Sequence, residues 1–185
     1  MIDETLLEAI ENMGKAVDHV QAQFIGVRTG RANASLVDKI QVEYFGAFVP
    51  LQQLASFQVP EARMLVVKPH DRGSIAAIEK AIQASDLGLS PSNDGVVIRL
   101  NFPALTEERR KEFVKVVKNM AEEGRIAVRN VRRDARKIFE TAKKDGDISQ
   151  DELDRAEKEL EQLTQATVDT IDKAFTRKEH ELLEV

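Results

Sequence analysis

The stretch "LTEERRKEFVKVVKNMAEEGRIAVRNVRRDARKIFETAKKDGDIS", residues 105–149, decides the fold. Its apolar side chains recur at steps of three and four residues, the spacing of one face of an α-helix. They are Phe113, Val117, Met120, Gly124, Ala127, Val131, Ala135, Ile138 and Ala142. Thr106 can cap the start of this helix, and the polar turn "KKDGDIS" ends it near Lys144. The stretch therefore predicts one long amphipathic helix.

Two more segments carry the same kind of stripe. The first comprises Leu6, Ile10, Met13, Val17, Val20, Phe24 and Val27, and Gly30 is expected to end that helix as a left-handed cap. Ser149 and Glu152 have the spacing of a capping box, which starts the last helix. Its stripe comprises Leu153, Ala156, Leu160, Leu163, Thr167, Ile171 and Ala174, and it continues toward Leu182. Three amphipathic helices predict a long three-helix bundle.

The segment between the first two helices has a different character, since all five prolines lie there. Ile40, Val42 and Tyr44 alternate along a strand pattern, and the β-rich runs 64–69 and 96–101 are bounded by turn residues. A short helix is expected where Ile75, Ile78 and Ile82 share one face. The fold class predicted is α+β, with a small β/α/β domain inserted into the bundle.

The predicted domain boundaries follow from this pattern. Residues 1–30 and 105–185 form the bundle, and residues 31–104 form the inserted domain. The chain crosses between the two at adjacent points, and such a double link can act as a hinge. The predicted hinge residues are Thr29, Gly30, Pro103 and Ala104.

Charge is distributed unevenly along a chain whose net formal charge is −5. Residues 105–144 carry 13 basic and 7 acidic side chains, whereas residues 145–185 carry 5 basic and 13 acidic ones. At about 100° per residue, the arginines of the long helix fall on one arc turned away from Val131. They are Arg125, Arg129, Arg132, Arg133 and Arg136, and Lys111, Lys115, Lys118 and Lys143 share the arc.

Two interpretations of this basic arc stay open. A charge run on a helix is commonly a solvated face, here partly neutralised by the acidic third helix. We expect instead that most acids of the third helix lie beside their own stripe, which leaves an arc of arginines suited to phosphate. Without a helix-turn-helix, a zinc site or an aromatic strip, RNA backbone or shape recognition is favoured over base reading. The segment "RTGRAN", residues 28–33, is either a helix cap and bend or a second RNA contact.

Other classes of function find little support. The chain has no cysteine, and His19, His70 and His180 have no partner at metal-ligand spacing. Phosphate-loop, dinucleotide and nucleophile-elbow motifs are missing, so we predict neither an enzyme nor a cofactor nor a metal site. The acidic N-terminus is unlike a secretory or transit signal, and no run reaches the roughly 18 apolar residues of a membrane span. A cytoplasmic protein without membrane contact is expected.

The sequence resembles the ribosome recycling factor family. The motifs that carry the resemblance are "RTGRAN" from Arg28, "VEYFGAFVPLQQLAS" from Val42, "EKAIQASDLGL" from Glu79, "LTEERR" from Leu105 and "VRNVRRDA" from Val128. They occur in the family's order and cover essentially the whole chain.

The resemblance implies an L-shaped, monomeric molecule whose bundle binds rRNA of the large ribosomal subunit after termination. It also implies that elongation factor G, with GTP, drives splitting of the ribosome and release of mRNA and tRNA. The predicted rRNA-binding residues are Arg28, Arg31, Arg110, Arg125, Arg129, Arg132, Arg133 and Arg136. The alternatives are an adaptor that binds structured RNA without recycling, and a structural helical protein with an acidic partner.

Overall fold

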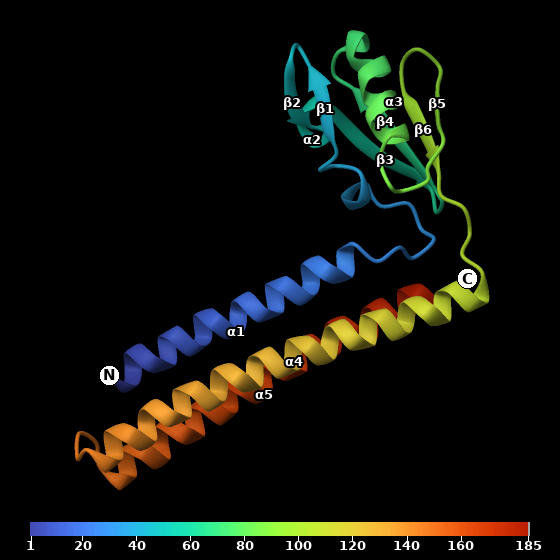
Figure 1. Cartoon of the computed structure of the whole chain (residues 1–185). Helices are drawn as coiled ribbons and strands as arrows, with labels where there is room; N and C mark the ends of the chain where they lie inside the picture. Colours follow the sequence, from blue (N-terminus) through green and yellow to red (C-terminus); the bar gives the residue numbers. More distant parts are fainter. Residues whose placement is uncertain (185) are drawn as a thin grey trace. The chain divides into compact units, whose positions relative to one another are not determined.

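The chain divides into two compact units in a computed structural model that describes residues 1–184. Residues 1–27 and 111–185 make the helical unit, and residues 28–110 make the small unit. The helical unit is built from α1 (Ile2–Ile25), α4 (Glu107–Lys144) and α5 (Gln150–Leu183), which run alongside one another in Figure 1. The prediction of an α+β protein with a three-helix bundle is confirmed.

Local signals fix both ends of α4 and the start of α5 where the sequence predicts them. The Thr106 hydroxyl accepts a hydrogen bond from the Arg109 N–H at 3.2 Å, and so caps the start of α4. At the other end Gly146 has φ +80°, and the N–H of Asp147 bonds back to the Ala142 carbonyl at 2.9 Å. This is the left-handed glycine termination that ends many helices. Ser149 then starts α5 through the predicted capping box.

The buried residues of the helical unit largely match the predicted stripes, but the buried face of α4 is rotated about the helix axis. In α4 the fully buried apolar side chains are Val117, Ala121, Val128 and Phe139, so the buried face centres on Val128 rather than on Val131. Ile138 and Ile10, which we placed in the stripes, are 44% and 51% exposed. The reason is that each helix of a three-helix bundle faces two neighbours, so its buried face is broader and turned relative to a single narrow stripe.

Gly124 lies where side chains of α1 and α5 pack against the backbone of α4. A Cβ atom built on it would overlap Cγ2 of Val20 in α1 and lie 3.4 Å from Cδ1 of Ile171 in α5. Val20 and Ile171 are both buried. The missing side chain of Gly124 therefore lets a methyl group of α1 rest against the backbone of α4.

The first helix ends earlier than predicted. Its last residue is Ile25, and the residue after it, Gly26, has an ordinary right-handed φ of −70°. A tight turn ends the helix, because the N–H of Val27 bonds to the Phe24 carbonyl at 3.1 Å. Gly30 does have a left-handed φ of +81°, but it lies beyond the helix and caps nothing. The predicted cap at Gly30 is wrong.

The small unit contains an antiparallel sheet of four strands and a separate hairpin. Its elements are η1 (Ala34–Leu36), β1 (Gln41–Tyr44), β2 (Ala47–Pro50), α2 (Leu51–Leu54), β3 (Ala55–Glu61), β4 (Met64–Pro69), η2 (Arg72–Ser74), α3 (Ile75–Gln83), β5 (Pro91–Asn93) and β6 (Ile98–Asn101). The sheet order is β3-β4-β6-β5, and β1 pairs with β2. Ile78 and Ile82 of α3 are fully buried in the same core as Leu65, Val67 and Leu100 of the sheet.

The sequence predicted β1, β4, β6 and α3 and missed β2, β3 and β5. The turn between β1 and β2 has φ values of +50° at Phe45 and +79° at Gly46, which is the geometry of a two-residue hairpin. β5 holds only three residues and starts with Pro91, and β3 alternates weakly with most of its side chains exposed. Such short or polar strands are formed by pairing with a neighbour and leave little trace in the sequence.

Candidate nucleic-acid interface

Five arginines of α4 form what we call the basic face: Arg125, Arg129, Arg132, Arg133 and Arg136. α4 places them on one side because each lies three or four residues from another member of the set. Their exposure differs widely. The Arg125 side chain is 18% exposed, whereas those of Arg133 and Arg136 are 65% and 60% exposed.

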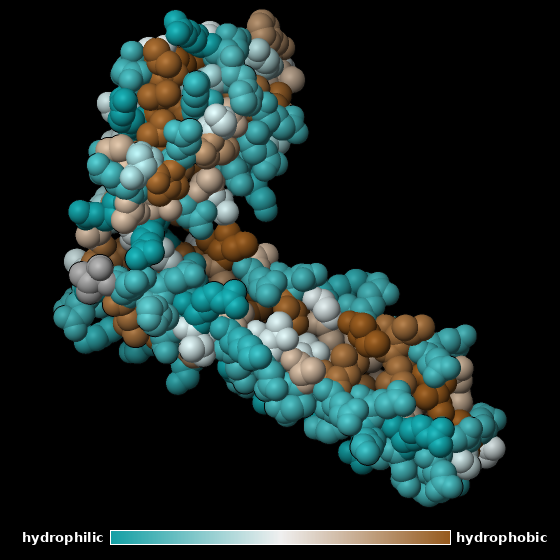
Figure 2. Space-filling view, turned by 180° about the vertical axis from the view of Figure 1, so that it is seen from behind, coloured by the Kyte–Doolittle hydropathy of each residue, from teal (hydrophilic) through white to brown (hydrophobic). Residues whose placement is uncertain are grey.

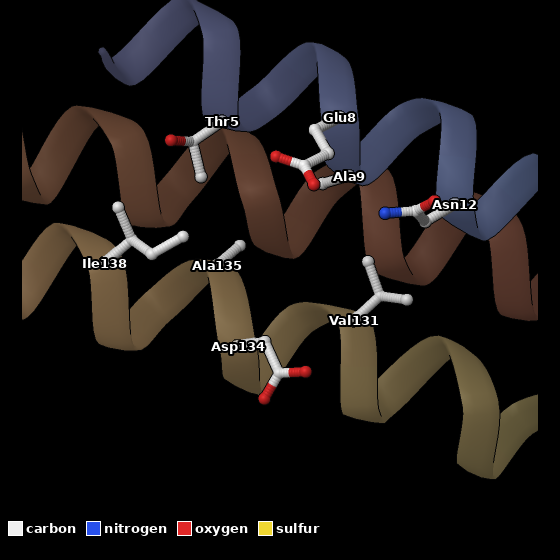
Figure 3. Close-up of a pocket in the computed structure, with 8 residues that line it drawn as sticks. All are labelled: Thr5, Glu8, Ala9, Asn12, Val131, Asp134, Ala135 and Ile138. Carbon is white, nitrogen blue, oxygen red and sulfur yellow. The ribbon is translucent and has the colours of Figure 1, made fainter.

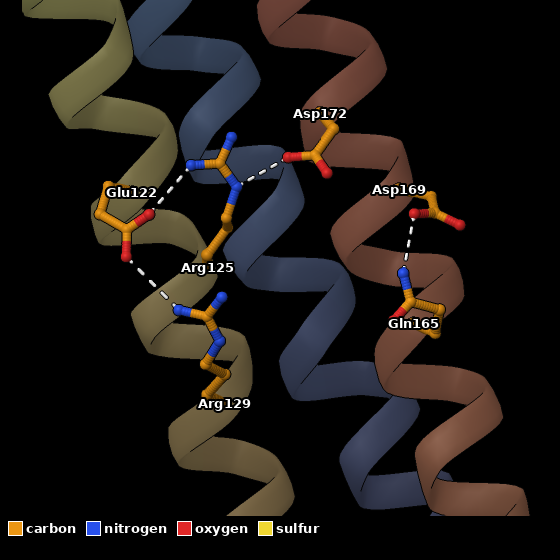
Figure 4. Close-up of polar contacts among 6 residues, drawn as sticks. All are labelled: Glu122, Arg125, Arg129, Gln165, Asp169 and Asp172. Carbon is orange, nitrogen blue, oxygen red and sulfur yellow. Dashed lines mark hydrogen bonds and ion pairs between the residues drawn. The ribbon is translucent and has the colours of Figure 1, made fainter.

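Arg125 joins two helices of the bundle, as Figure 4 shows. Its Nε donates to Oδ1 of Asp172 on α5 at 2.7 Å, and its Nη1 donates to Oε2 of Glu122 at 3.0 Å. Burial opposes the charged form, but the two carboxylates outweigh that effect and raise the pKa of Arg125. The second oxygen of Glu122 accepts from Arg129 at 3.4 Å. Arg125 therefore serves mainly to hold α4 and α5 together rather than to bind a ligand.

Acidic side chains of α5 reach the other end of the basic face as well. Nη1 of Arg132 lies 3.3 Å from Oε2 of Glu161, and Nε of Arg136 lies 3.3 Å from Oε1 of Glu157. Arg136 also pairs with Glu140, one turn on in α4, at 3.0 Å. Our expectation that the acids of the third helix stay beside their own stripe is wrong at these positions. Long arginine and glutamate side chains bridge two neighbouring helices even when both start from the solvent side.

Arg133 is the least engaged member of the basic face. Its nearest carboxylate, Asp134, is 3.9 Å from Nε, which is too far for a hydrogen bond. Lys115 and Lys118 of α4 are exposed, and within residues 1–184 neither makes an ion pair. A guanidinium fork with its donors turned to solvent suits a phosphate group, which accepts two parallel hydrogen bonds.

The other three predicted RNA contacts belong to the small unit. Nη2 of Arg28 donates to the Pro103 carbonyl at 3.4 Å, and its guanidinium carbon lies 5.8 Å from the centre of the Phe102 ring. The Nε atoms of Arg28 and Arg110 are buried without a hydrogen-bond partner. Arg31 is exposed, and its backbone N–H bonds to the Thr29 hydroxyl at 3.4 Å. Arg28 thus ties two segments of the small unit together, and an RNA contact by "RTGRAN" stays a prediction.

The residues predicted as a hinge lie at these same two segments. Gly30 is buried, and a Cβ atom on it would lie 3.6 Å from Cγ of Leu105. Pro103 and Ala104 are exposed. Motion at Thr29, Gly30, Pro103 and Ala104 stays a prediction.

A groove between α1 and α4 is unsuited to nucleic acid. Figure 3 shows Val131, Ala135 and Ile138 of α4 below Thr5, Glu8, Ala9 and Asn12 of α1, and the groove has a volume of about 150 Å³. Its apolar part comes from Ala9, Val131, Ala135 and Ile138, whereas Glu8 and Asp134 add negative charge. Phosphate would meet repulsion here. Figure 2 shows apolar side chains gathered on one stretch of the helical unit, in keeping with the exposed Leu7, Ile10 and Ile138.

Two other kinds of site find no support in residues 1–184. No helix in this part of the chain is long and apolar enough to cross a membrane. No group of three or more histidine, aspartate or glutamate side chains within it is placed to hold a metal ion.

The acidic partners of the basic face were not predicted from the sequence. Glu157, Glu161 and Asp172 are separated by four and by eleven residues, which places them on one side of α5. That spacing was a usable signal, but it could not show that this side of α5 faces the arginines of α4.

The chain combines a three-helix bundle with an inserted α+β unit and an arginine-rich helix face, and comparison with known proteins defines its family. The family model for ribosome recycling factor matches residues 20–183. A ribosome-recycling factor from Thermobifida fusca is 56% identical over 185 residues, and one from Cutibacterium acnes is 53% identical over 184 residues. Both alignments cover 100% of this chain and of the relative.

Solved structures agree with this result. The solution structure of a ribosome recycling factor superposes with a TM-score of 0.83 at 41% identity, covering 100% of this chain and 98% of that one. A second neighbour is the Thermus thermophilus ribosome recycling factor, from a structure with Escherichia coli elongation factor G bound to the Escherichia coli post-termination complex. Its TM-score is 0.71 at 43% identity, with 99% of each chain covered. The chain belongs to the ribosome recycling factor family, whose members are translation factors and not enzymes.

Proposed function

We propose that this protein binds the post-termination ribosome and, with elongation factor G and GTP, splits it into subunits, so that mRNA and tRNA are released. The observation that carries the proposal is the full-length match to relatives named ribosome-recycling factor. The mechanism is mechanical. The protein contributes binding energy and a rigid helical unit, and GTP hydrolysis belongs to the elongation factor. The protein acts as a monomer, in the cytoplasm, where ribosomes are.

The surface that meets rRNA of the large subunit is, in this proposal, the basic face together with Arg28, Arg31 and Arg110. Arg133 contributes most, because it is the most exposed of the five and has the most distant carboxylate. Arg125 contributes least, because it is largely covered and held by Asp172. Residues 31–104 form the domain on which elongation factor G acts, with motion at the predicted hinge residues.

Binding to vacant large ribosomal subunits across a salt series tests the surface. Arg133→Glu replaces one phosphate contact by the opposite charge and is expected to weaken binding about tenfold or more. The slope of the logarithm of the binding constant against the logarithm of the salt concentration should become shallower by about one. Lys173→Glu is the matched control. It makes the same charge change on an exposed residue of α5 that forms no ion pair within the described residues.

The two variants separate a specific contact from a general charge effect. Lys173→Glu should bind nearly as the wild type does. Equal binding by wild type and Arg133→Glu would contradict the proposed contact of Arg133 with rRNA. Recycling itself is measured by light scattering of ribosomes, and subunit splitting without elongation factor G and GTP would contradict the proposed mechanism.

A further inference from the structure

The carboxylates beside the basic face carry an inference about its selectivity. The arginines Arg125, Arg129, Arg132 and Arg136 lie within 4 Å of five carboxylates. These belong to Glu122, Glu140, Glu157, Glu161 and Asp172. The face is thus rich in guanidinium groups and yet close to neutral in local charge. A face built only for attraction of RNA would lack these acids.

Charge cancellation acts mainly at long range. An arginine and its paired carboxylate form a dipole, whose potential falls off faster with distance than that of a single charge, so a polyanion several ångströms away is attracted less by the pair than by an unpaired arginine. Generic binding to nucleic acid depends on this long-range, sequence-independent attraction. The paired acids therefore weaken the attraction of the basic face for any RNA.

Contacts at short range survive the pairing. A guanidinium group has five N–H donors. Arg132 uses Nη1 for Glu161 and Arg129 uses Nη1 for Glu122. Within the part of the chain that the structure describes, Nη2 of Arg129 and of Arg132 makes no hydrogen bond. A rigid RNA surface that presents phosphates at the right positions can bind these donors directly.

The carboxylates also hold the arginines in place. Arg132 and Arg136 are each anchored to α5, by Glu161 and Glu157, at a distance of 3.3 Å. An anchored side chain loses less conformational entropy when it binds, which favours a ligand of fixed geometry over a flexible one. For such a ligand, the gain from anchoring offsets the repulsion between the carboxylate and phosphate.

We propose that Glu157 and Glu161 are specificity-determining residues, which suppress generic RNA binding by the basic face while leaving its binding to folded ribosomal RNA nearly unchanged. This inference rests on the proposed function, since it takes rRNA as the ligand of the basic face. It adds a role for α5, whose acids screen the arginines of α4.

The test compares Glu161→Gln with Glu159→Gln. Both substitutions remove one negative charge from α5 and keep the side-chain length. Glu161 faces Arg132, whereas Glu159 is exposed and forms no ion pair among residues 1–184. Each variant is titrated with a generic RNA duplex and with vacant large ribosomal subunits over a range of salt concentrations. Circular dichroism verifies that each variant is folded, as expected because exposed ion pairs contribute little to stability.

Glu161→Gln is expected to bind the generic duplex about threefold more tightly at low salt, the effect in water of one charge about 7 Å away. The double variant Glu157→Gln and Glu161→Gln should bind the generic duplex about tenfold more tightly than the wild type at low salt. Glu159→Gln should change binding little. Affinity for the large subunit should rise by less than the affinity for the duplex, so the ratio of the two affinities falls.

Two results would overturn the inference. One is equal duplex binding by Glu161→Gln and Glu159→Gln. The other is an equal gain on duplex and on large subunits, since no selectivity would then be lost. Failure of the proposed function gives a different result, because Arg133→Glu would then bind large subunits as tightly as the wild type does.

Discussion

The packing at Gly124 predicts opposite effects for two glycine substitutions in the helical unit. Gly124→Ala would place a methyl group against Cγ2 of Val20, a side chain that is 1% exposed and enclosed by the core. Overpacking of this kind costs about 1 to 3 kcal/mol. The better helix propensity of alanine returns about 0.5 to 1 kcal/mol. The net expectation is a loss of about 1 to 2 kcal/mol in the free energy of unfolding.

Gly14→Ala is the matched control. Gly14 is an exposed residue inside α1, and a Cβ atom on it would meet no atom within 4 Å. Only the propensity effect remains, so this variant should be more stable than the wild type by about 0.5 to 1 kcal/mol. Urea denaturation followed by far-UV circular dichroism measures both changes as shifts of the midpoint at constant slope.

A double variant shows whether the overlap with Val20 is the cause. Val20→Ala alone removes the methyl groups that Gly124 accommodates and should destabilise the unit. In that background Gly124→Ala should stabilise, because the new methyl group fills the space. If Gly124→Ala stabilises the wild type as much as Gly14→Ala does, the close approach of α1 and α4 at Gly124 is refuted.

Two further predictions concern single local contacts. Backbone N–H groups of Val97 and Val96, each 2.9 Å from Oδ1 of Asp94, lower the pKa of that carboxyl to about 2. Arg99, at 2.9 Å from Oδ2, adds to the effect. Because the pKa is lower in the folded state, Asp94 stabilises the small unit above about pH 4, and this contribution is lost as the pH falls toward 2. Thermal midpoints of wild type and Asp94→Asn should therefore differ at neutral pH and converge near pH 2; a constant difference would contradict the assignment. Ser149→Ala, which removes the cap of α5, should cost about 1 kcal/mol in urea denaturation, and an unchanged midpoint would show that the capping box contributes nothing.

The sequence alone determined the elements whose signals are local. The cap at Thr106, the turn at Gly146 and the capping box at Ser149 depend on side chains and backbone groups a few residues apart. The same holds for α3, whose three isoleucines already lie on one face. The arginine arc on α4 was also visible, because positions along one helix have fixed relative directions.

Only the tertiary structure decided which partner each face meets. Ile138 belongs to an apolar stripe by its spacing and is nevertheless exposed. The rotation of α4 about its own axis, which decides which face is buried, depends on both neighbouring helices. The weak strands β3 and β5 exist through pairing with β4 and β6. The pairing of Arg132 with Glu161 joins residues of two helices, and no spacing within either helix shows that they meet. Contacts between distant segments depend on packing free energy summed over the whole core, which local patterns do not contain.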